Sequence, residues 1–329
     1  MRNIKRIIAA AISAALLGAA LCGCSSENSG SAGGDKPLVI ATILPAYDFA
    51  RQVFGDTAEV RMLLKPGQES HSYDPSAKDI VDISGCDLFI YNGGESDEWV
   101  ESVLKSAPEV NTFRMTEAVS LLDEEISEGM QEHEHDVDDH DHDEHDEHDD
   151  HDEEYDEHVW TSPENAAAIV RALGTKAAEL FPENSEVLAS NAGSYAAKID
   201  ELDGRFAELF SGEQRYFIFG DRFPLLYFFK EYGLNYYAAF PGCGSETEPS
   251  AQTMTFLLEK LKEDNSVPAV FCIELSSRRL ADVLAEDTGL STVEFHTCHN
   301  ISSDDFNAGE TWLSIMQRNY DTLSEILKR

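Results

Sequence analysis

The 11 histidines of this 329-residue chain fall into two groups with different surroundings. Seven lie between His133 and His151, in a run made almost entirely of histidine and acids ("HDHDEHDEHDDHDEE", 140–154). Imidazole and carboxylate groups both bind divalent cations, so this composition predicts metal binding. Such a run offers many similar sites without fixed geometry, whereas a tight site needs about four ligands held by packed backbone. The other histidines are His71, His158, His296 and His299.

Three of these isolated histidines stand at boundaries between expected elements. His71 lies in "KPGQESHSYDPS", between a strand and a helix. His158 lies in "DEHVWTSPENA", just before a helix, and His296 closes the strand-like "STVEFH". Ligands of open α/β sheets bind beside the carboxyl ends of strands. We therefore expect His71, His158 and His296 to form one metal site.

The elements that must position these residues follow a βαβ pattern, which predicts a parallel sheet. The apolar run "LVIATIL" is typical of a buried parallel strand, and the amphipathic helix "AYDFARQVFGD" follows it. In the helix "DPSAKDIVDISGC" we expect Ile80, Val81 and Ile83 to face inward. The expected strands are 38–44, 58–64 and 87–93, and the expected helices are 46–56, 74–86, 97–107 and 162–181.

A long helical run separates this first alternation from a second one. Apolar residues from Val187 to Leu209 recur at intervals of three or four, over more length than a crossover helix needs. We predict an α/β protein of two lobes, 37–183 and 212–329, each with a parallel β-sheet flanked by helices, joined by a rigid linker helix at 184–211. The second lobe has expected strands at 215–221, 235–240, 269–275 and 291–296, and expected helices at 225–233, 250–264, 278–289 and 308–329.

The charge of the chain is strongly negative and unevenly spread. The formal net charge is −39, which excludes a general nucleic-acid binder because phosphate contacts need Lys and Arg. Residues 123–157 contain 21 acids and no Lys or Arg, so this His/Asp/Glu-rich loop carries over half of that charge. We expect the loop to raise the local cation concentration over about a Debye length, ~8–10 Å, and so to lead cations toward His158.

The first residues predict export and a lipid anchor. Basic residues precede an apolar stretch too short to span a membrane, which predicts a signal peptide over 1–23. The ending "LCGC" resembles a bacterial lipobox and predicts cleavage before Cys24 and lipidation of its sulfur; Cys22 fits this pattern less well. Residues 24–36 then form a flexible tether. The expected location is the extracytoplasmic face of the cell membrane.

Besides Cys22 and Cys24, the chain has four cysteines, and export would place them in an oxidising compartment where disulfides can form. Cys86 and Cys272 lie in strand-like apolar runs, where buried free thiols are expected. Cys243 ("PGCGS") and Cys298 ("HTCHN") lie in loop-like contexts. We predict a disulfide between Cys243 and Cys298.

Several motifs occur together in the order and at the spacing of one family. The chain resembles the zinc-type, ZnuA-like (cluster 9, cluster A-I) solute-binding lipoproteins of metal ABC importers over residues 37–329. This resemblance implies two lobes bridged by a rigid helix, with the metal in the cleft between them. The motifs are "LLKPGQESHSYDPSAKDI", "DLFIYNGGESDEWV", "DEHVWTSPENA", "KEYGL", "SETEPS" and "TWLSIMQRN".

The resemblance also implies a set of metal ligands. The family's histidine after a Pro-Gly turn and its histidine in "HVW" match His71 and His158, and its ligand at a late strand end matches His296. At the third ligand position of the family this chain differs, because it has Arg222 there and a guanidinium group does not bind a metal ion. Two versions stay open: the neighbouring Asp221 completes the sphere, or water does.

The implied function is high-affinity capture of Zn²⁺ and its delivery to an ABC permease in the membrane, by a monomer that is not an enzyme. Three imidazoles favour zinc over manganese, which prefers oxygen ligands. A zinc hydrolase is disfavoured because the chain has no HExxH motif and no Ser or Cys in a recognisable nucleophile setting. The alternatives are a binding protein for manganese or another divalent metal, and a metal-buffering or adhesin-like surface lipoprotein that uses the loop alone.

Overall fold

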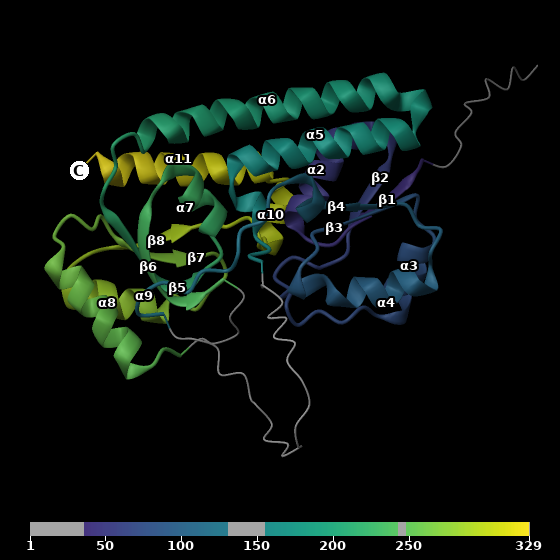
Figure 1. Cartoon of the computed structure of the whole chain (residues 1–329). Helices are drawn as coiled ribbons and strands as arrows, with labels where there is room; N and C mark the ends of the chain where they lie inside the picture. Colours follow the sequence, from purple (N-terminus) through teal and green to yellow (C-terminus); the bar gives the residue numbers. More distant parts are fainter. Residues whose placement is uncertain (1–35, 131–154, 243–247, 329) are drawn as a thin grey trace, which may run out of the picture. The chain divides into compact units, whose positions relative to one another are not determined.

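The computed structural model describes residues 36–130, 155–242 and 248–328 (Figure 1). The chain divides into Met1–Lys36 and a compact unit, Pro37–Arg329, and only the second is described below. The expected signal peptide and, apart from Lys36, the expected tether lie outside the described residues. No described helix is long and apolar enough to cross a membrane.

The first lobe is built on a four-stranded parallel sheet in the order β2-β1-β3-β4. The two central strands are the most apolar and the most buried, as expected for a sheet that is covered on both faces. The sequence analysis missed β4, a three-residue strand at the edge of the sheet. The strands are β1 (Leu38–Ala41), β2 (Glu59–Met62), β3 (Leu88–Tyr91) and β4 (Thr112–Arg114).

Local signals define the helices of this lobe. Ser76 and Asp79 form a capping box, so α3 begins at Ala77, three residues later than the expected helix 74–86. Ser162 accepts a hydrogen bond from the Asn165 N–H, and Pro163 opens α5. The helices are α2 (Leu44–Phe54), α3 (Ala77–Ser84), α4 (Glu98–Ser106) and α5 (Pro163–Leu180).

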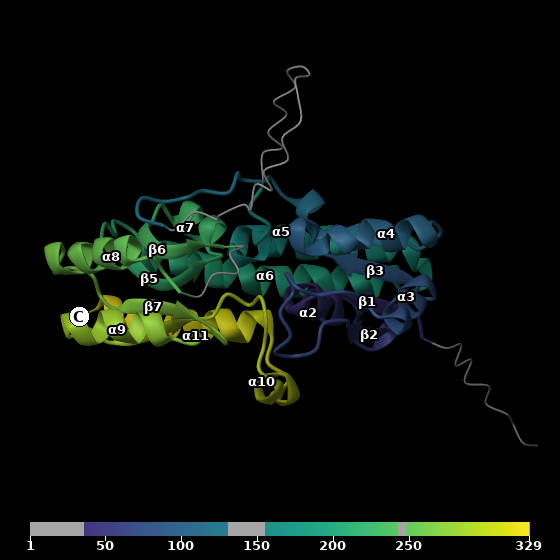
Figure 2. The same ribbon diagram turned by 90° about the horizontal axis from the view of Figure 1, so that it is seen from below.

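The long helix α6 (Ser185–Leu209) packs along α5 and contacts both lobes (Figures 1 and 2). Near its start, Asn191 Nδ2 donates a hydrogen bond to the Val53 carbonyl at the end of α2, at 3.0 Å. Near its end, Phe206 packs edge-on against Phe228 of the second lobe, with ring centroids 5.1 Å apart. One helix therefore fixes parts of both lobes.

The second lobe repeats the architecture with a parallel sheet in the order β6-β5-β7-β8. The predicted fold class, two lobes with parallel sheets flanked by helices, is confirmed. The strands are β5 (Tyr216–Phe223), β6 (Asn235–Pro241), β7 (Val270–Ile273) and β8 (Thr292–Phe295). The helices are α7 (Leu226–Tyr232), α8 (Ala251–Glu263), α9 (Arg279–Thr288), α10 (Ser303–Ala308) and α11 (Trp312–Leu327). Short 3-10 helices cover Gly55–Thr57, Glu95–Asp97, Met115–Ala118, Val159–Thr161 and Pro182–Asn184.

A buried carboxylate, Asp48 of α2, links α2 with α6 and α11. Asp48, which is fully buried, accepts hydrogen bonds from the Tyr195 hydroxyl and the Trp312 N–H, both at 2.8 Å. Arg51 also donates to Asp48 at 2.8 Å, so the buried negative charge is paired. The Trp312 indole N–H in turn donates to the Trp160 carbonyl at 3.0 Å. The backbone at Trp160, in the first lobe, is therefore tied to α11 of the second lobe.

Val81, which was expected to face inward, is exposed, and so is Val187. Val81 is 69% exposed and Val187 is 49% exposed. In α3, Ile83 is buried, and Ile80, one turn earlier, lies on the same face. Val81 follows Ile80 by one residue, about 100° around the helix, so it cannot share that face.

Candidate metal centre

Three histidines from distant parts of the sequence meet in the structure. One potential ligand atom from each of His71, His158 and His299 lies within 4.8 Å of the other two. The ring centroids are 6.2 Å apart for His71 and His158, 5.5 Å for His71 and His299, and 5.4 Å for His158 and His299. The structure thus brings together two of the expected ligands with a histidine that was not expected.

His71 lies in the loop between β2 and α3, and this loop is held against the second lobe. The Gly67 N–H donates to Asn300 Oδ1 at 2.9 Å, and Asn300 Nδ2 donates to the Gln68 carbonyl at 2.7 Å. Ser70 Oγ lies 2.6 Å from His299 Nε2. These contacts hold the His71 loop beside the loop that carries His299.

His158 is fully buried and stands immediately before the 3-10 helix Val159–Thr161. Its backbone N–H donates to Asp156 Oδ1 at 2.8 Å, and its Nδ1 lies 3.1 Å from the same oxygen. The Tyr227 hydroxyl holds the Asp156 carbonyl at 2.8 Å. A carboxylate that accepts the Nδ1 proton leaves the Nε2 lone pair of His158 available to a metal.

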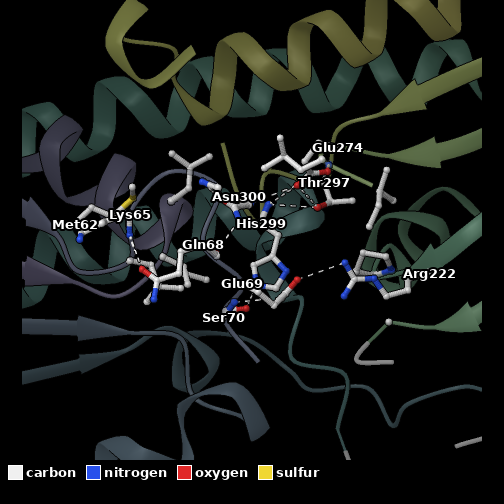
Figure 3. Close-up of a pocket in the computed structure, with 18 residues that line it drawn as sticks. Met62, Lys65, Gln68, Glu69, Ser70, Arg222, Glu274, Thr297, His299 and Asn300 are labelled. Atoms are coloured by element: carbon white, nitrogen blue, oxygen red, sulfur yellow. Dashed lines mark hydrogen bonds and ion pairs between the residues drawn. The ribbon is translucent and has the colours of Figure 1, made fainter. Parts of the chain in front are cut away.

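His299 is placed by a loop after β8 that wraps around Glu274 (Figure 3). The Glu274 carboxylate accepts from the Thr297 N–H and hydroxyl, both at 2.7 Å, and from the His299 N–H at 3.2 Å. Between them Cys298 adopts a left-handed φ of 61°, unusual for a residue other than glycine. The loop geometry therefore turns His299 toward His71 and His158.

The electrostatics of the three rings differ. Burial, and next the charge of His158, lowers the pKa of His71 to about 4. Burial and the two neighbouring histidines hold the pKa of His299 well below its ordinary value. Burial also opposes protonation of His158, but Asp156 outweighs it and raises the pKa of that ring. His71 and His299 are thus neutral at pH 7, which is the form that ligates.

The donor set fits a divalent transition metal. The Nε2 atoms of His71 and His158 are buried and have no hydrogen-bond partner among the described residues. Buried polar atoms are usually hydrogen-bonded, so two such nitrogens beside a third histidine point to a shared ligand. In a tetrahedral zinc site the nitrogens stand about 3.3 Å apart, which small side-chain movements from the present spacing would reach.

His296 does not belong to this group, contrary to the sequence analysis. Its Nδ1 accepts a hydrogen bond from the Cys298 N–H at 3.0 Å. Its backbone is clamped by Asn319 of α11, whose Oδ1 accepts from the His296 N–H at 3.0 Å and whose Nδ2 donates to its carbonyl at 2.7 Å. His296 therefore supports the loop, and His299, three residues later, reaches the other histidines.

Asp221 does not belong to the group either. Its carboxylate accepts from the Ile273 N–H of β7 at 3.2 Å and from the Arg222 N–H at 2.9 Å, and burial raises its pKa. Arg222 lies 3.6 Å from Glu69 in an ion pair beside His299 (Figure 3). The Asp221 carboxylate is thus engaged with the backbone of β5 and β7 and is not grouped with the three histidines.

Of the predicted disulfide between Cys243 and Cys298, the structure describes only Cys298. This residue is a free, fully buried thiol whose Sγ lies 4.0 Å from the Trp312 carbonyl. Cys243 lies outside the described residues. Cys272 is also a free, buried thiol, as expected, and Cys86 is a free thiol of intermediate exposure.

The His/Asp/Glu-rich loop was expected over 123–157, and the structure describes both of its ends. Asp123 and Tyr155 form an antiparallel bridge, and the Asp156 N–H donates to the Leu122 carbonyl at 2.9 Å. Lys230 of α7 pairs with Glu125 at 2.7 Å, and Met130 is buried. All seven clustered histidines fall in 131–154, outside the described residues.

Comparison with known proteins places the chain in one family. Residues 39–326 match the family model described as ZnuA, zinc-uptake complex component A, periplasmic. The chain is 32% identical to the high-affinity zinc uptake system protein ZnuA of Bacillus subtilis over 317 residues, 96% of each chain. It is 31% identical to the zinc-binding lipoprotein AdcA of Streptococcus pneumoniae over 319 residues, 94% of this chain and 60% of that protein. The chain thus spans about three-fifths of AdcA.

Solved structures agree with these matches. The Zn(II)-bound ZnuA-like domain of Streptococcus pneumoniae AdcA superposes with a TM-score of 0.70 at 28% identity, covering 89% of this chain and 100% of that domain. The metal-dependent lipoprotein YcdH of Bacillus subtilis superposes with a TM-score of 0.72 at 27% identity, covering 89% and 100%. With its two lobes, its bridging helix and the match over residues 39–326, the chain belongs to the ZnuA family of zinc-uptake components.

Proposed function

We propose that this protein is an extracytoplasmic solute-binding lipoprotein that captures Zn²⁺ and delivers it to an ABC permease in the membrane. The observation that carries this proposal is the group His71, His158 and His299, two of which present buried Nε2 atoms without a partner among the described residues. Relatives that are named for zinc binding and zinc uptake support the same metal. Imidazole donors also favour zinc over manganese.

In this function the three histidines bind the metal and the rest of the site orients them. Asp156 holds the His158 ring, Ser70 contacts the His299 ring, and Glu274 holds the loop that carries His299. Ligands supplied by both lobes suit a protein that must release its cargo, because separating the lobes would divide the ligand set. The protein acts as a carrier with no catalysed reaction, and as a monomer.

Chelator competition and calorimetry with the purified protein test this function. We expect one tight Zn²⁺ equivalent per chain, much weaker Mn²⁺ binding at the same site, and no hydrolytic turnover with the zinc-loaded protein. Tighter binding of Mn²⁺ than of Zn²⁺ would favour the alternative metal. Absence of any tight equivalent would contradict the proposal.

The membrane location rests on Cys24, which lies outside the described residues. In the organism that makes this protein, Cys24→Ala should move it from the membrane to the soluble fraction, because one or more acyl chains on the cysteine supply the attachment. Cys22→Ala is the matched control and should leave the protein on the membrane. A Cys24→Ala protein that remains on the membrane would contradict the lipid anchor.

A further inference from the structure

A second buried carboxylate stands beside the three histidines, and the site described above does not use it. Glu157 directly precedes His158, and its side chain is 1% exposed. Its Oε1 lies 3.7 Å from His71 Nδ1 and accepts no hydrogen bond from any described residue. A buried carboxylate oxygen without a donor is costly, so its position calls for a partner.

The protein holds this carboxylate in place from several sides. The Ser96 N–H donates to the other oxygen, Oε2, at 3.1 Å, and Asn92 Nδ2 donates to the Glu157 carbonyl at 2.8 Å. Gly94 has a φ of 123°, and a Cβ on it would lie 2.4 Å from Glu157 Oε2. Only glycine therefore lets the chain after β3 approach the carboxylate this closely.

We propose that Glu157 is a positioning residue for metal capture: it accepts the Nδ1 proton of His71 and so directs Nε2 of that ring to the metal. This inference rests on the proposed function. The 3.7 Å separation is too long for a hydrogen bond, and an approach of less than about 1 Å would create one of ordinary length. A carboxylate that accepts from a ligating histidine fixes its tautomer and makes it a better ligand.

In this proposal the adjacent residues Asp156 and Glu157 each orient one metal-binding histidine. Asp156 accepts from the ring of His158, and Glu157 accepts from the ring of His71, which comes from a different part of the chain. Asp156 and Glu157 also place two carboxyl groups beside a site whose ligands are all imidazoles. This arrangement suits a doubly charged cation and compensates for the lack of a carboxylate among the ligands.

Glu157→Gln is the sharpest test because the side chain keeps its shape. The Ser96 N–H and His71 Nδ1 face different oxygens of Glu157, and Gln keeps an oxygen at only one of these two positions and an NH2 group at the other. We expect Glu157→Gln and Glu157→Ala to lower the Zn²⁺ affinity of the purified protein 10- to 100-fold in chelator competition. Gly94→Ala should lower it too, by displacing the carboxylate.

Controls separate positioning from folding and from direct ligation. Glu98→Gln, an exposed carboxylate of the pocket that Glu157 lines, should leave the affinity unchanged. Metal-free Glu157→Gln should melt close to the parent, and with Co²⁺ bound its visible bands should keep the parent's positions, because the ligands stay the same. An unchanged Zn²⁺ affinity would overturn the proposal, and so would cobalt bands that shift as they do when a ligand is lost. A parent protein without a tight zinc site would instead contradict the proposed function.

Discussion

Gly174 of α5 faces Ala192 of α6 so closely that a Cβ on Gly174 would lie 2.3 Å from the Ala192 Cβ. Two helices approach to this distance only where one side chain is absent. Because α6 contacts both lobes, the spacing of these helices affects the part of the fold that holds the lobes together.

Gly174→Ala should destabilise the protein by about 1–3 kcal/mol, because the added methyl group forces α5 and α6 apart. Gly193→Ala, in an exposed position of α6 with no atom within 4 Å of the new Cβ, is the matched control. It should stabilise by roughly 0.5–1 kcal/mol through helix propensity. Urea unfolding of the metal-free proteins measures both, and equal effects of the two substitutions would contradict the close packing.

The pH dependence of zinc affinity should be shallow near neutrality. Protons compete with the metal for imidazole nitrogens, so affinity falls as pH falls. The pKa of His71 is lowered to about 4 and that of His299 is also lowered, so neither ring competes until the solution is strongly acidic. Against the effect of burial, Asp156 raises the pKa of His158, so this ring takes up a proton before the other two. We therefore expect the logarithm of the affinity to fall by no more than about one unit per pH unit between pH 7 and 5, because only one ring competes for a proton.

Chelator competition, corrected for protonation of the chelator, measures this slope. A slope of two or three between pH 7 and 6 would show that several rings take up protons together. It would contradict the different environments that the structure gives to the three histidines.

The histidine-rich segment should be separable from the tight site. Replacing 131–154 with a short Gly/Ser linker removes seven histidines and should remove several weak zinc equivalents while leaving one tight equivalent. The deletion should stop there, because Glu125, Met130 and Tyr155 make contacts in the described structure. A longer deletion of 124–153 should also lower the melting temperature of the metal-free protein. Loss of the tight equivalent from the shorter deletion in calorimetry would move the primary site into the segment.

Alanine substitutions should separate the ligands from the residues that only support them. Zinc at a thousandfold excess over Kd should stabilise the parent protein by about 4 kcal/mol and so raise its melting temperature. His71→Ala, His158→Ala and His299→Ala should each abolish most of this rise. His296→Ala should keep most of the zinc-dependent shift, although the metal-free protein should be less stable, because its Nδ1 accepts from the Cys298 N–H. Asp221→Ala should behave like His296→Ala. The reverse result, with His296 required and His299 dispensable, would restore the assignment expected from the sequence.

The sequence predicted the fold well where periodicity was strong and failed where elements were short. The apolar runs gave seven of the strands and the long helix, but β4 and the six-residue α10 have too few residues for a detectable period. Val81 shows a second limit, because several registers of a short helix fit the same apolar pattern.

The site shows what a sequence pattern cannot settle. His71 and His158 were found because each stands at an element boundary inside a specific motif. His296 was preferred over His299 because it stands at the end of an expected strand. The left-handed conformation of Cys298, which turns His299 toward His71 and His158, cannot be predicted from the periodicity of apolar residues. The only sequence feature that pointed to His299 was its position three residues after His296 in "HTCHN". The role of Glu157 also depends on contacts with residues more than sixty positions away, which become visible only in the fold.

A crystal structure of the zinc-loaded protein, with anomalous data on both sides of the zinc edge, tests the central claim most directly. We predict one strong anomalous peak within about 2.0–2.1 Å of a ring nitrogen of each of His71, His158 and His299, with a fourth ligand in tetrahedral geometry. His296 should remain hydrogen-bonded to the Cys298 N–H. A principal peak bound by His296 or Asp221 in place of His299, or found only within 131–154, would contradict the account.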